Sequence, residues 1–252
     1  MVRASVSLLH MTVTSTALNV ADGAMRCIKS VQKQTFGAWE HVFVDAKSSD
    51  NTAAFARTAA SKDTRTSVLV NTVRKAALEN VWEIWQTLPD DEVIVWLDGD
   101  DWLAHDRALQ VVADAYNAPN EPWLTYGQFM FTNGEIGFAS RYGDTPPRHD
   151  LKWRATHLKT FRAGLVKKIN PASLKTPAGV WCPYAIDRAV MFPLLDMAGG
   201  RYTFIPNILY VYNAEASHWA NETSSEEKDR VWDETYRIHR LPPYQRLEKR
   251  PW

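Results

Sequence analysis

The chain is poor in cysteine and has no excess of charge of either sign. Its 252 residues include only Cys27 and Cys182, which lie far apart and without metal-ligand spacing. This usage suits a reducing compartment and argues against a disulfide-stabilised scaffold. Lysine plus arginine and aspartate plus glutamate number 29 each, so the formal net charge is zero. Without an overall basic field, the protein is not expected to bind nucleic acid.

Long hydrophobic runs are also missing. No stretch approaches the roughly 18 to 20 apolar residues that span a bilayer. The apolar run near the N-terminus is interrupted by Ser5, Ser7 and His10, which is not typical of a signal peptide. We therefore expect a soluble, cytoplasmic protein. The basic tail at 246–250 allows peripheral contact with an anionic membrane or an acceptor, but a solvated terminus is the favoured interpretation.

Hydrophobic residues, including the aromatic ones, make up 45% of the chain. This content suffices for one large core. Over the first 122 residues, short apolar runs alternate with stretches of helical periodicity. The predicted strands are 6–11, 39–44, 67–70 and 93–97, and the predicted helices are 24–34, 78–88 and 109–116. This alternation predicts an α/β fold in which helices cover both faces of a mostly parallel sheet.

The pattern changes after about Pro122. The later predicted strands are 123–126, 128–132, 203–205 and 208–212, and the later predicted helices are 157–166, 183–198 and 224–239. This succession indicates a smaller mixed region followed by a charged helix and a tail. There is no internal repeat that would suggest a solenoid.

Three carboxylates follow the fourth predicted strand. Its apolar run ends at Leu97 and gives way to Asp98, Gly99, Asp100 and Asp101. If Gly99 lets the backbone bend sharply, Asp98 and Asp100 can face one hard cation, for which carboxylate oxygens are suitable ligands. The alternative is an acidic surface turn that caps the next helix.

A second acidic position lies at the end of another predicted strand. Asp45 follows the strand 39–44 and opens a polar loop at 46–52. Ligands of parallel sheets bind beyond the carboxyl ends of the strands, which meet at one edge. We therefore expect Asp45 and the segment 98–101 to meet at one crevice.

With these loops placed, the sequence resembles family 2 glycosyltransferases of the GT-A fold over about residues 5–215. The matching segments are 6–9 with Thr12, 28–35, 44–45, 48–52, Asn71, 97–101, 157–162, Asp187 with 193–196, and 209–213. Their order and spacing are specific as a set. The resemblance implies that 1–122 is the nucleotide-sugar-binding half of a single domain, 123–220 its acceptor-binding half, and 221–252 a C-terminal helix and tail.

The resemblance also implies a donor site. The residues that it places against the donor are Thr12, Asp45, Asn71, Asp98 and Asp101. Asp98 would touch either the ribose or the metal. Asp100 would hold Mn²⁺ or Mg²⁺ at the diphosphate. His218 would be a further metal ligand; the alternative is a solvated loop histidine. Two departures weaken the contact to the base: Met11 stands where the family usually has proline, and Ala46 where it has a second aspartate.

On the acceptor side, the resemblance implies that Asp187 is the catalytic base. A carboxylate at this helix start can take the proton of the acceptor hydroxyl as that oxygen attacks the anomeric carbon. The alternative is a helix cap, and Ile186 stands where the family often has a second acidic residue. Trp181 lies near the expected acceptor cleft, where its ring would stack on a sugar or simply pack in the core.

These features predict an inverting, metal-dependent glycosyltransferase of glycan or polysaccharide biosynthesis, with a hexose as the expected sugar. It would move the sugar from a UDP- or GDP-sugar to a hydroxyl of a carbohydrate or glycoconjugate. Direct displacement with a single base implies inversion. A sugar nucleotidyltransferase is a rival, but segment 12–23 lacks the glycine-rich phosphate loop expected of it. A catalytically silent nucleotide- or carbohydrate-binding module is the other alternative.

Overall fold

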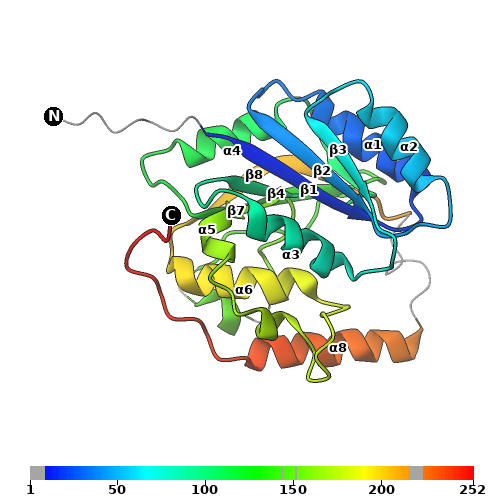
Figure 1. The fold of residues 1–252 in the computed structure, drawn as a ribbon. Helices are drawn as coiled ribbons and strands as arrows, with labels where there is room; N and C mark the ends of the chain where they lie inside the picture. The colour runs from blue at the N-terminus through cyan, green and yellow to red at the C-terminus, as the bar shows by residue number, and fades with distance from the viewer. Residues whose placement is uncertain (1–8, 144, 151, 216–223) are drawn as a thin grey trace.

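Strands from both halves of the sequence join one sheet in the computed structural model, which describes residues 9–143, 145–150, 152–215 and 224–252 (Figure 1). The strand order is β3-β2-β1-β4-β7-β6-β8-β5. The strands are β1 (Met11–Ala17), β2 (Trp39–Asp45), β3 (Thr66–Val70), β4 (Val93–Trp96), β5 (Trp102–Leu103), β6 (Leu124–Phe131), β7 (Lys159–Arg162) and β8 (Tyr202–Tyr212). The first four strands in chain order are parallel to one another, whereas β7 and β5 run antiparallel to their neighbours.

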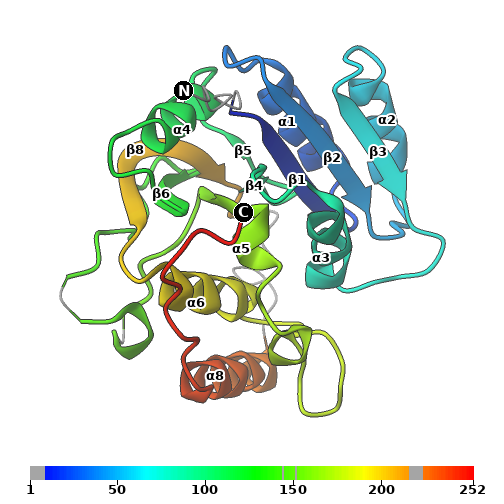
Figure 2. The same ribbon diagram turned by 60° about the vertical axis from the view of Figure 1, so that its left-hand side comes forward.

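Helices cover both faces of this sheet (Figure 2). The α-helices are α1 (Ala21–Gln32), α2 (Thr52–Ala60), α3 (Ala77–Thr87), α4 (Ala108–Tyr116), α5 (Ala163–Val166), α6 (Ile186–Ala198) and α8 (Ser225–Arg240). Two 3₁₀ turns, Pro147–His149 and Pro171–Leu174, precede β7 and α6 respectively. None of the described helices is long and apolar enough to cross a membrane.

Alternate residues of β4 show how the sheet separates two cores. Val93 and Val95 belong to the cluster that includes α1, α2 and α4, whereas Ile94 and Trp96 belong to the cluster that includes α3, α5 and α6. All four side chains are buried. Successive residues of a strand point to opposite faces, so a continuous apolar run is typical of a strand that is covered on both sides. The predicted α/β class is confirmed.

The first strand begins later than its apolar content predicted. The expected strand was 6–11, but β1 starts at Met11 and continues through the polar run of threonines and Ser15. Threonine is β-branched and suits a strand, provided that its hydroxyl finds a partner when buried. The partners are Glu92 for Thr12, Trp85 for Thr14, His41 for Ser15 and Asn80 for Thr16.

Three later predictions of secondary structure are also corrected. The predicted helix 157–166 is β7 followed by the single turn α5, because residues 159–162 pair with β4 on one side and β6 on the other. The two strands expected in 123–132 are the one strand β6. The two expected in 203–212 are the one strand β8, whose pairing with β6 shifts register near Pro206.

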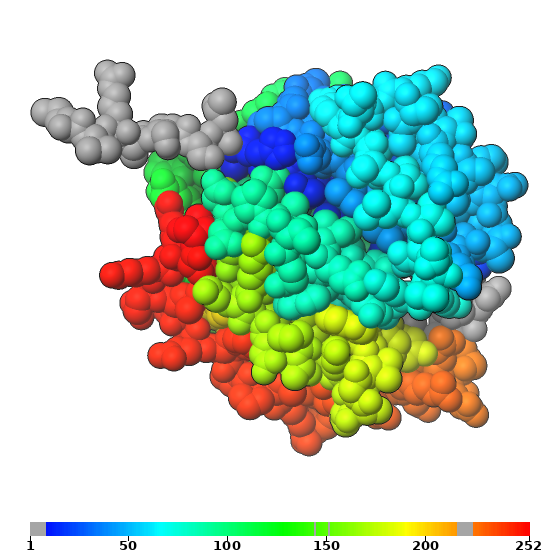
Figure 3. Space-filling model, viewed as in Figure 1, coloured from blue at the N-terminus to red at the C-terminus, as the bar shows by residue number. Residues whose placement is uncertain are grey.

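The C-terminal segment packs against the rest of the protein instead of extending into solvent. Helix α8 lies on the side of α6 that faces away from the sheet, and the tail then runs back along the molecule (Figures 2 and 3). At its end, the ring of Trp252 contacts that of Trp123 with centroids 5.3 Å apart, and Arg250 pairs with Glu121. These contacts hold the end of the chain, while the basic side chains of 246–250 stay exposed, as the sequence suggested.

Candidate active site

The acidic loop after β4 is held against the end of β1. The amide of Leu97 donates to the carbonyl of Thr14 and that of Gly99 to the carbonyl of Thr16, both at 3.1 Å. A Cβ at position 99 would lie 2.6 Å from the Cβ of Ala17 and 2.6 Å from the oxygen of Thr16. Such distances are far inside van der Waals contact, so this close approach requires glycine.

The three carboxylates of this loop differ in exposure and in partners. Asp98 keeps 31% of its side chain exposed, and Asp100 is half-buried. Asp101, in contrast, is buried and accepts hydrogen bonds from the hydroxyl of Tyr210 and, at 2.6 Å, from the backbone amide of Asn213. Its carboxylate therefore ties β8 to the loop, and the expected contact of Asp101 with substrate does not match this inward orientation.

Asp98 and Asp100 are the described groups that suit a divalent cation. Burial, and after it the charge of Asp98, raises the pKa of Asp100 to about 6. Both causes disfavour the charged carboxylate, and a bound cation would offset them. In the described part of the chain, no cluster of three or more His, Cys, Asp or Glu side chains is arranged to hold a metal. His218, expected as a further ligand, lies outside the described residues.

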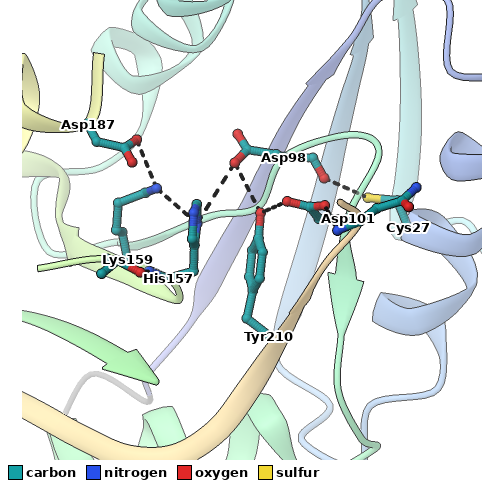
Figure 4. Close-up of polar contacts among 9 residues, drawn as sticks. Cys27, Asp98, Asp101, His157, Lys159, Asp187 and Tyr210 are labelled. Atoms are coloured by element: carbon teal, nitrogen blue, oxygen red, sulfur yellow. Dashed lines mark hydrogen bonds and ion pairs between the residues drawn. The ribbon is translucent and has the colours of Figure 1, made fainter. Parts of the chain in front are cut away.

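A continuous series of polar contacts links Asp98 to Asp187 (Figure 4). The ammonium of Lys159 donates to Oδ1 of Asp187 at 2.9 Å and to Nδ1 of His157 at 3.1 Å. His157 stacks on Tyr210 with ring centroids 4.3 Å apart, and the Tyr210 hydroxyl donates to Oδ2 of Asp98 at 3.0 Å. Residues from four separate segments of the chain thus form one cluster between the acidic loop and α6, with the buried Lys159 and Tyr210 at its centre.

Lys159 sets the electrostatics of this cluster. Its side chain is fully buried, and its ammonium lies 4.7 Å from the centroid of the Trp96 ring. Burial would raise the pKa of Asp187, but Lys159 and, to a lesser extent, His157 outweigh it and lower that pKa. Burial and then Lys159 lower the pKa of His157 to about 3, so the ring is neutral at pH 7. Its 3.9 Å approach to Asp98 is therefore not an ion pair.

Residues predicted to bind the donor meet at the carboxyl edge of the sheet. Asp45 ends β2, and its carbonyl accepts from the amide of Asn71 at 2.9 Å. The side chain of Asn71 donates to Asn80 at 2.7 Å, and Asn80 donates to Thr16 at 3.1 Å. Asp45 is buried; its Oδ2 accepts from the amide of Ser48, but its Oδ1 has no hydrogen-bond partner in the described structure.

Thr12 does not join this group. It is the second residue of β1 and lies at the opposite end of that strand, where its hydroxyl donates to Glu92 at 2.7 Å. The prediction placed Thr12 in a loop because it ended the strand at Met11. Since β1 continues to Ala17, the residues at its carboxyl end are Thr16, Ala17 and Leu18, and Thr12 lies away from the edge where the other predicted donor residues meet.

A hollow of about 390 Å³ opens beside this edge. Its lining comes from the ends of β1 and β2 and from the segments that lead into α3 and α6. The lining residues are Thr16, Ala17, Leu18, Ala46, Arg74, Lys75, Ala76, Ala77, Cys182, Pro183 and Ile186. The hollow is thus mostly apolar, with two cations on one side, which suits a flat ring attached to an anionic group.

Trp181 lies in the segment that leads to α6. Its ring packs on that of Trp82, with centroids 6.1 Å apart, and the ammonium of Lys175 lies 4.9 Å from its centroid. These contacts account for the position of the ring through packing. Stacking on an acceptor sugar stays a prediction.

Comparison with known proteins identifies the family. The model of "Glycosyl transferase family 2" matches residues 12–170. The chain belongs to this family. No curated protein sequence matches the chain.

Solved structures of glycosyltransferases have the same fold. A Staphylococcus aureus TarS fragment in complex with UDP-GlcNAc is 16% identical, with a TM-score of 0.64 over 91% of this chain and 65% of that one. Glucosyl-3-phosphoglycerate synthase from Mycobacterium tuberculosis, in complex with Mn²⁺, UDP and glucosyl-3-phosphoglycerate, is 15% identical, with a TM-score of 0.61 over 93% and 81%. A mannosyltransferase from Pyrobaculum calidifontis, in complex with GDP-Man and Mn²⁺, is 13% identical, with a TM-score of 0.58 over 94% and 71%. The chain spans 43% of the TarS chain in a further structure.

The family 2 match and the GT-A resemblance confirm the predicted family and fold. The residues predicted for the site did not include Lys159, His157 or Tyr210. The feature that marks Lys159 is its buried environment: the side chains of 157–161 are all buried, and the ammonium of Lys159 lies over the Trp96 ring. It was missed because that segment was assigned to a helix, which would turn Lys159 and Phe161 to different faces.

Proposed function

We propose that this family 2 protein transfers a sugar from a nucleoside-diphosphate donor to a hydroxyl of a carbohydrate or glycoconjugate, with inversion at the anomeric carbon. The observation that carries the proposal is the buried series of contacts from Asp98 to Asp187. It joins one carboxylate on the acidic loop to another on α6 through Lys159, His157 and Tyr210. A single base facing a donor site is what direct displacement needs.

In this proposal, the donor occupies the hollow at the ends of β1 and β2. The unpartnered Oδ1 of Asp45 would accept a hydrogen bond from an N–H group of the base, because a buried acceptor without a partner is unfavourable. Arg74, which is exposed at the hollow, would approach the diphosphate. Asp98 and Asp100 would hold Mn²⁺ or Mg²⁺, which stabilises the negative charge of a departing diphosphate.

Asp187 would act as the base. The acceptor oxygen forms a bond to the anomeric carbon while the bond from that carbon to the diphosphate oxygen breaks, and the leaving diphosphate keeps the electron pair. The attacking oxygen becomes acidic as its bond forms, and its proton passes to the carboxylate of Asp187. Lys159 favours the ionised carboxylate before the reaction, and its hydrogen bond fixes the orientation of Oδ1.

The test compares binding with turnover. A panel of UDP- and GDP-sugars is assayed for binding by thermal shift and for release of the nucleoside diphosphate, with Mn²⁺, with Mg²⁺ and with a chelator. Asp187→Asn should keep donor binding and lose turnover by roughly 10²- to 10⁴-fold, the usual contribution of a general base. Asp114→Asn, an exposed change on α4, is the matched control and should behave as the wild type.

Each part of the proposal has its own failure. If no nucleotide binds under any metal condition, the donor site is wrong. If donors bind but neither the wild type nor the control turns over with any sugar acceptor, the protein is a catalytically silent binding module. If Asp187→Asn retains turnover, the base lies elsewhere. Retained anomeric configuration in the product would exclude direct displacement.

A further inference from the structure

A second hollow of about 440 Å³ lies on the acceptor side of α6. Six residues from three segments line it: Phe138, Ser140, Lys152, Trp153, Arg154 and Arg188. Three of the six are cations, and none of these described lining residues carries a carboxylate. Arg188 directly follows Asp187 in the first turn of α6, so the hollow borders the proposed base.

Arg188 is placed where a cation needs a further partner. Its Nε is buried without a hydrogen-bond partner in the described structure, and its guanidinium lies 5.2 Å from the centroid of the Trp153 ring. A cation in the first turn of a helix also opposes the helix dipole, so stabilising α6 does not explain its position. Burial lowers the pKa of Arg188, although the nearby Asp187 raises it. A bound anion in the hollow would reach the guanidinium from the open side, at its terminal nitrogens and not at the buried Nε.

The other two cations are arranged in complementary ways. Arg154 is fixed by hydrogen bonds from Nε to Asp150 at 2.6 Å and from Nη1 to Ser140 at 2.7 Å. Lys152 is exposed, and within the described residues its ammonium makes no hydrogen bond or ion pair. One rigid and one free cation therefore flank Arg188. With the aromatic faces of Trp153 and Phe138 beside them, the hollow offers stacking for a ring and charge for an anionic substituent.

We propose that this hollow binds an anionic group, a phosphate or a carboxylate, on the acceptor. The inference rests on the proposed function and specifies its acceptor class, a hydroxyl-bearing molecule with a negative charge. Arg188 and Lys152 would bind the negative charge, and Asp187 would receive the proton of the hydroxyl. The donor diphosphate is assigned to the other hollow, on the Arg74 side of the crevice.

The test uses three probes that differ at one carbon: glucose 6-phosphate, glucuronate and glucose. Binding of each is measured by calorimetry in the presence of saturating nucleoside diphosphate and metal. We expect the wild type to bind at least one anionic probe roughly 10- to 100-fold more tightly than glucose, the range of one or two charge-assisted hydrogen bonds. The two anionic probes distinguish phosphate from carboxylate recognition.

Two variants assign that preference to the hollow. Arg188→Gln and Lys152→Gln should each reduce it roughly tenfold, whereas Lys168→Gln, an exposed lysine outside this lining, should leave it unchanged. Binding of the nucleoside diphosphate alone should be the same in all variants. Circular dichroism and thermal unfolding verify that each variant is folded.

The inference is overturned if the wild type binds neither anionic probe more tightly than glucose. It is also overturned if Arg188→Gln weakens nucleoside diphosphate binding, because the arginine would then belong to the donor site, or if it leaves the preference intact. These results are separable from failure of the proposed function, which would appear as absent donor binding or absent turnover in the wild type.

Discussion

Replacing Lys159 with methionine tests how the buried cluster supports the base. Methionine keeps most of the stem volume but removes the hydrogen bonds to Asp187 and His157. Removing one partner of a buried ion pair typically costs about 3–5 kcal/mol of stability. Because Asp187 keeps 30% of its side chain exposed and can be hydrated, we expect a smaller loss, about 2–3 kcal/mol, measured by urea unfolding at pH 7.

The same change should alter the pH dependence of turnover. Burial raises the pKa of Asp187, and Lys159 is the largest influence that lowers it. Without Lys159 this pKa rises, the carboxylate becomes protonated sooner as pH falls, and the acid limb of kcat/KM moves to higher pH. Lys167→Gln, which breaks the more exposed pair with Asp90, should cost at most about 1 kcal/mol and leave the limb in place. Equal stability losses and identical pH profiles for the two variants would refute this account of Lys159.

Three further predictions concern the loop and the core. Gly99→Ala should destabilise the protein by about 1–3 kcal/mol through overpacking against β1 and weaken metal-dependent donor binding; unchanged binding would mean that the turn tolerates a Cβ. Tyr210→Phe removes the hydroxyl that donates to Asp98 and Asp101 and should cost about 1–3 kcal/mol; an equally stable variant would contradict this role. Burial lowers the pKa of His41 to about 3, so the unfolded chain binds a proton below about pH 6.5 that the native state does not. The free energy of unfolding should therefore fall by about 2 kcal/mol between pH 6.5 and 5 because of this residue. In His41→Gln, the urea midpoint should depend less steeply on pH over this range. An unchanged slope would refute the prediction.

The sequence predicted the parallel half of the fold well because its strands and helices carry strong periodic signals. Residues 93–97 are continuously apolar, and β4 occupies 93–96 with both faces covered. The stripe that includes Trp82 and Trp85 was expected on a helix, and both rings are buried on α3. The acidic loop 98–101 directly follows β4 and lies against the end of β1, at the carboxyl edge of the sheet where the local pattern predicted it.

The sequence failed where burial depends on partners far away in the chain. The threonines of β1 have the composition of a polar loop. They form a buried strand because residues such as Glu92 and Trp85, more than 70 positions away, are hydrogen-bond partners of their hydroxyls. The role of Lys159 was missed for the same reason. A lysine in a short segment gives no sign that it will form an ion pair with an aspartate 28 positions later. Such polar cores depend on tertiary contacts that no local window contains.

The charges of the cluster suggest why the proposed base and the proposed cation site would lie close together. Asp98 and Asp187 both contact a network with one buried cation, Lys159. Burial raises the pKa of Asp98, Lys159 lowers it, and the charge of the nearby Asp187 raises it further. One ammonium cannot neutralise Asp98, Asp100 and Asp187 together. A divalent cation at the acidic loop would supply the missing positive charge and leave Lys159 to stabilise the ionised form of Asp187. In the proposed mechanism, occupation of the donor site and ionisation of the base would therefore favour each other through the same buried network.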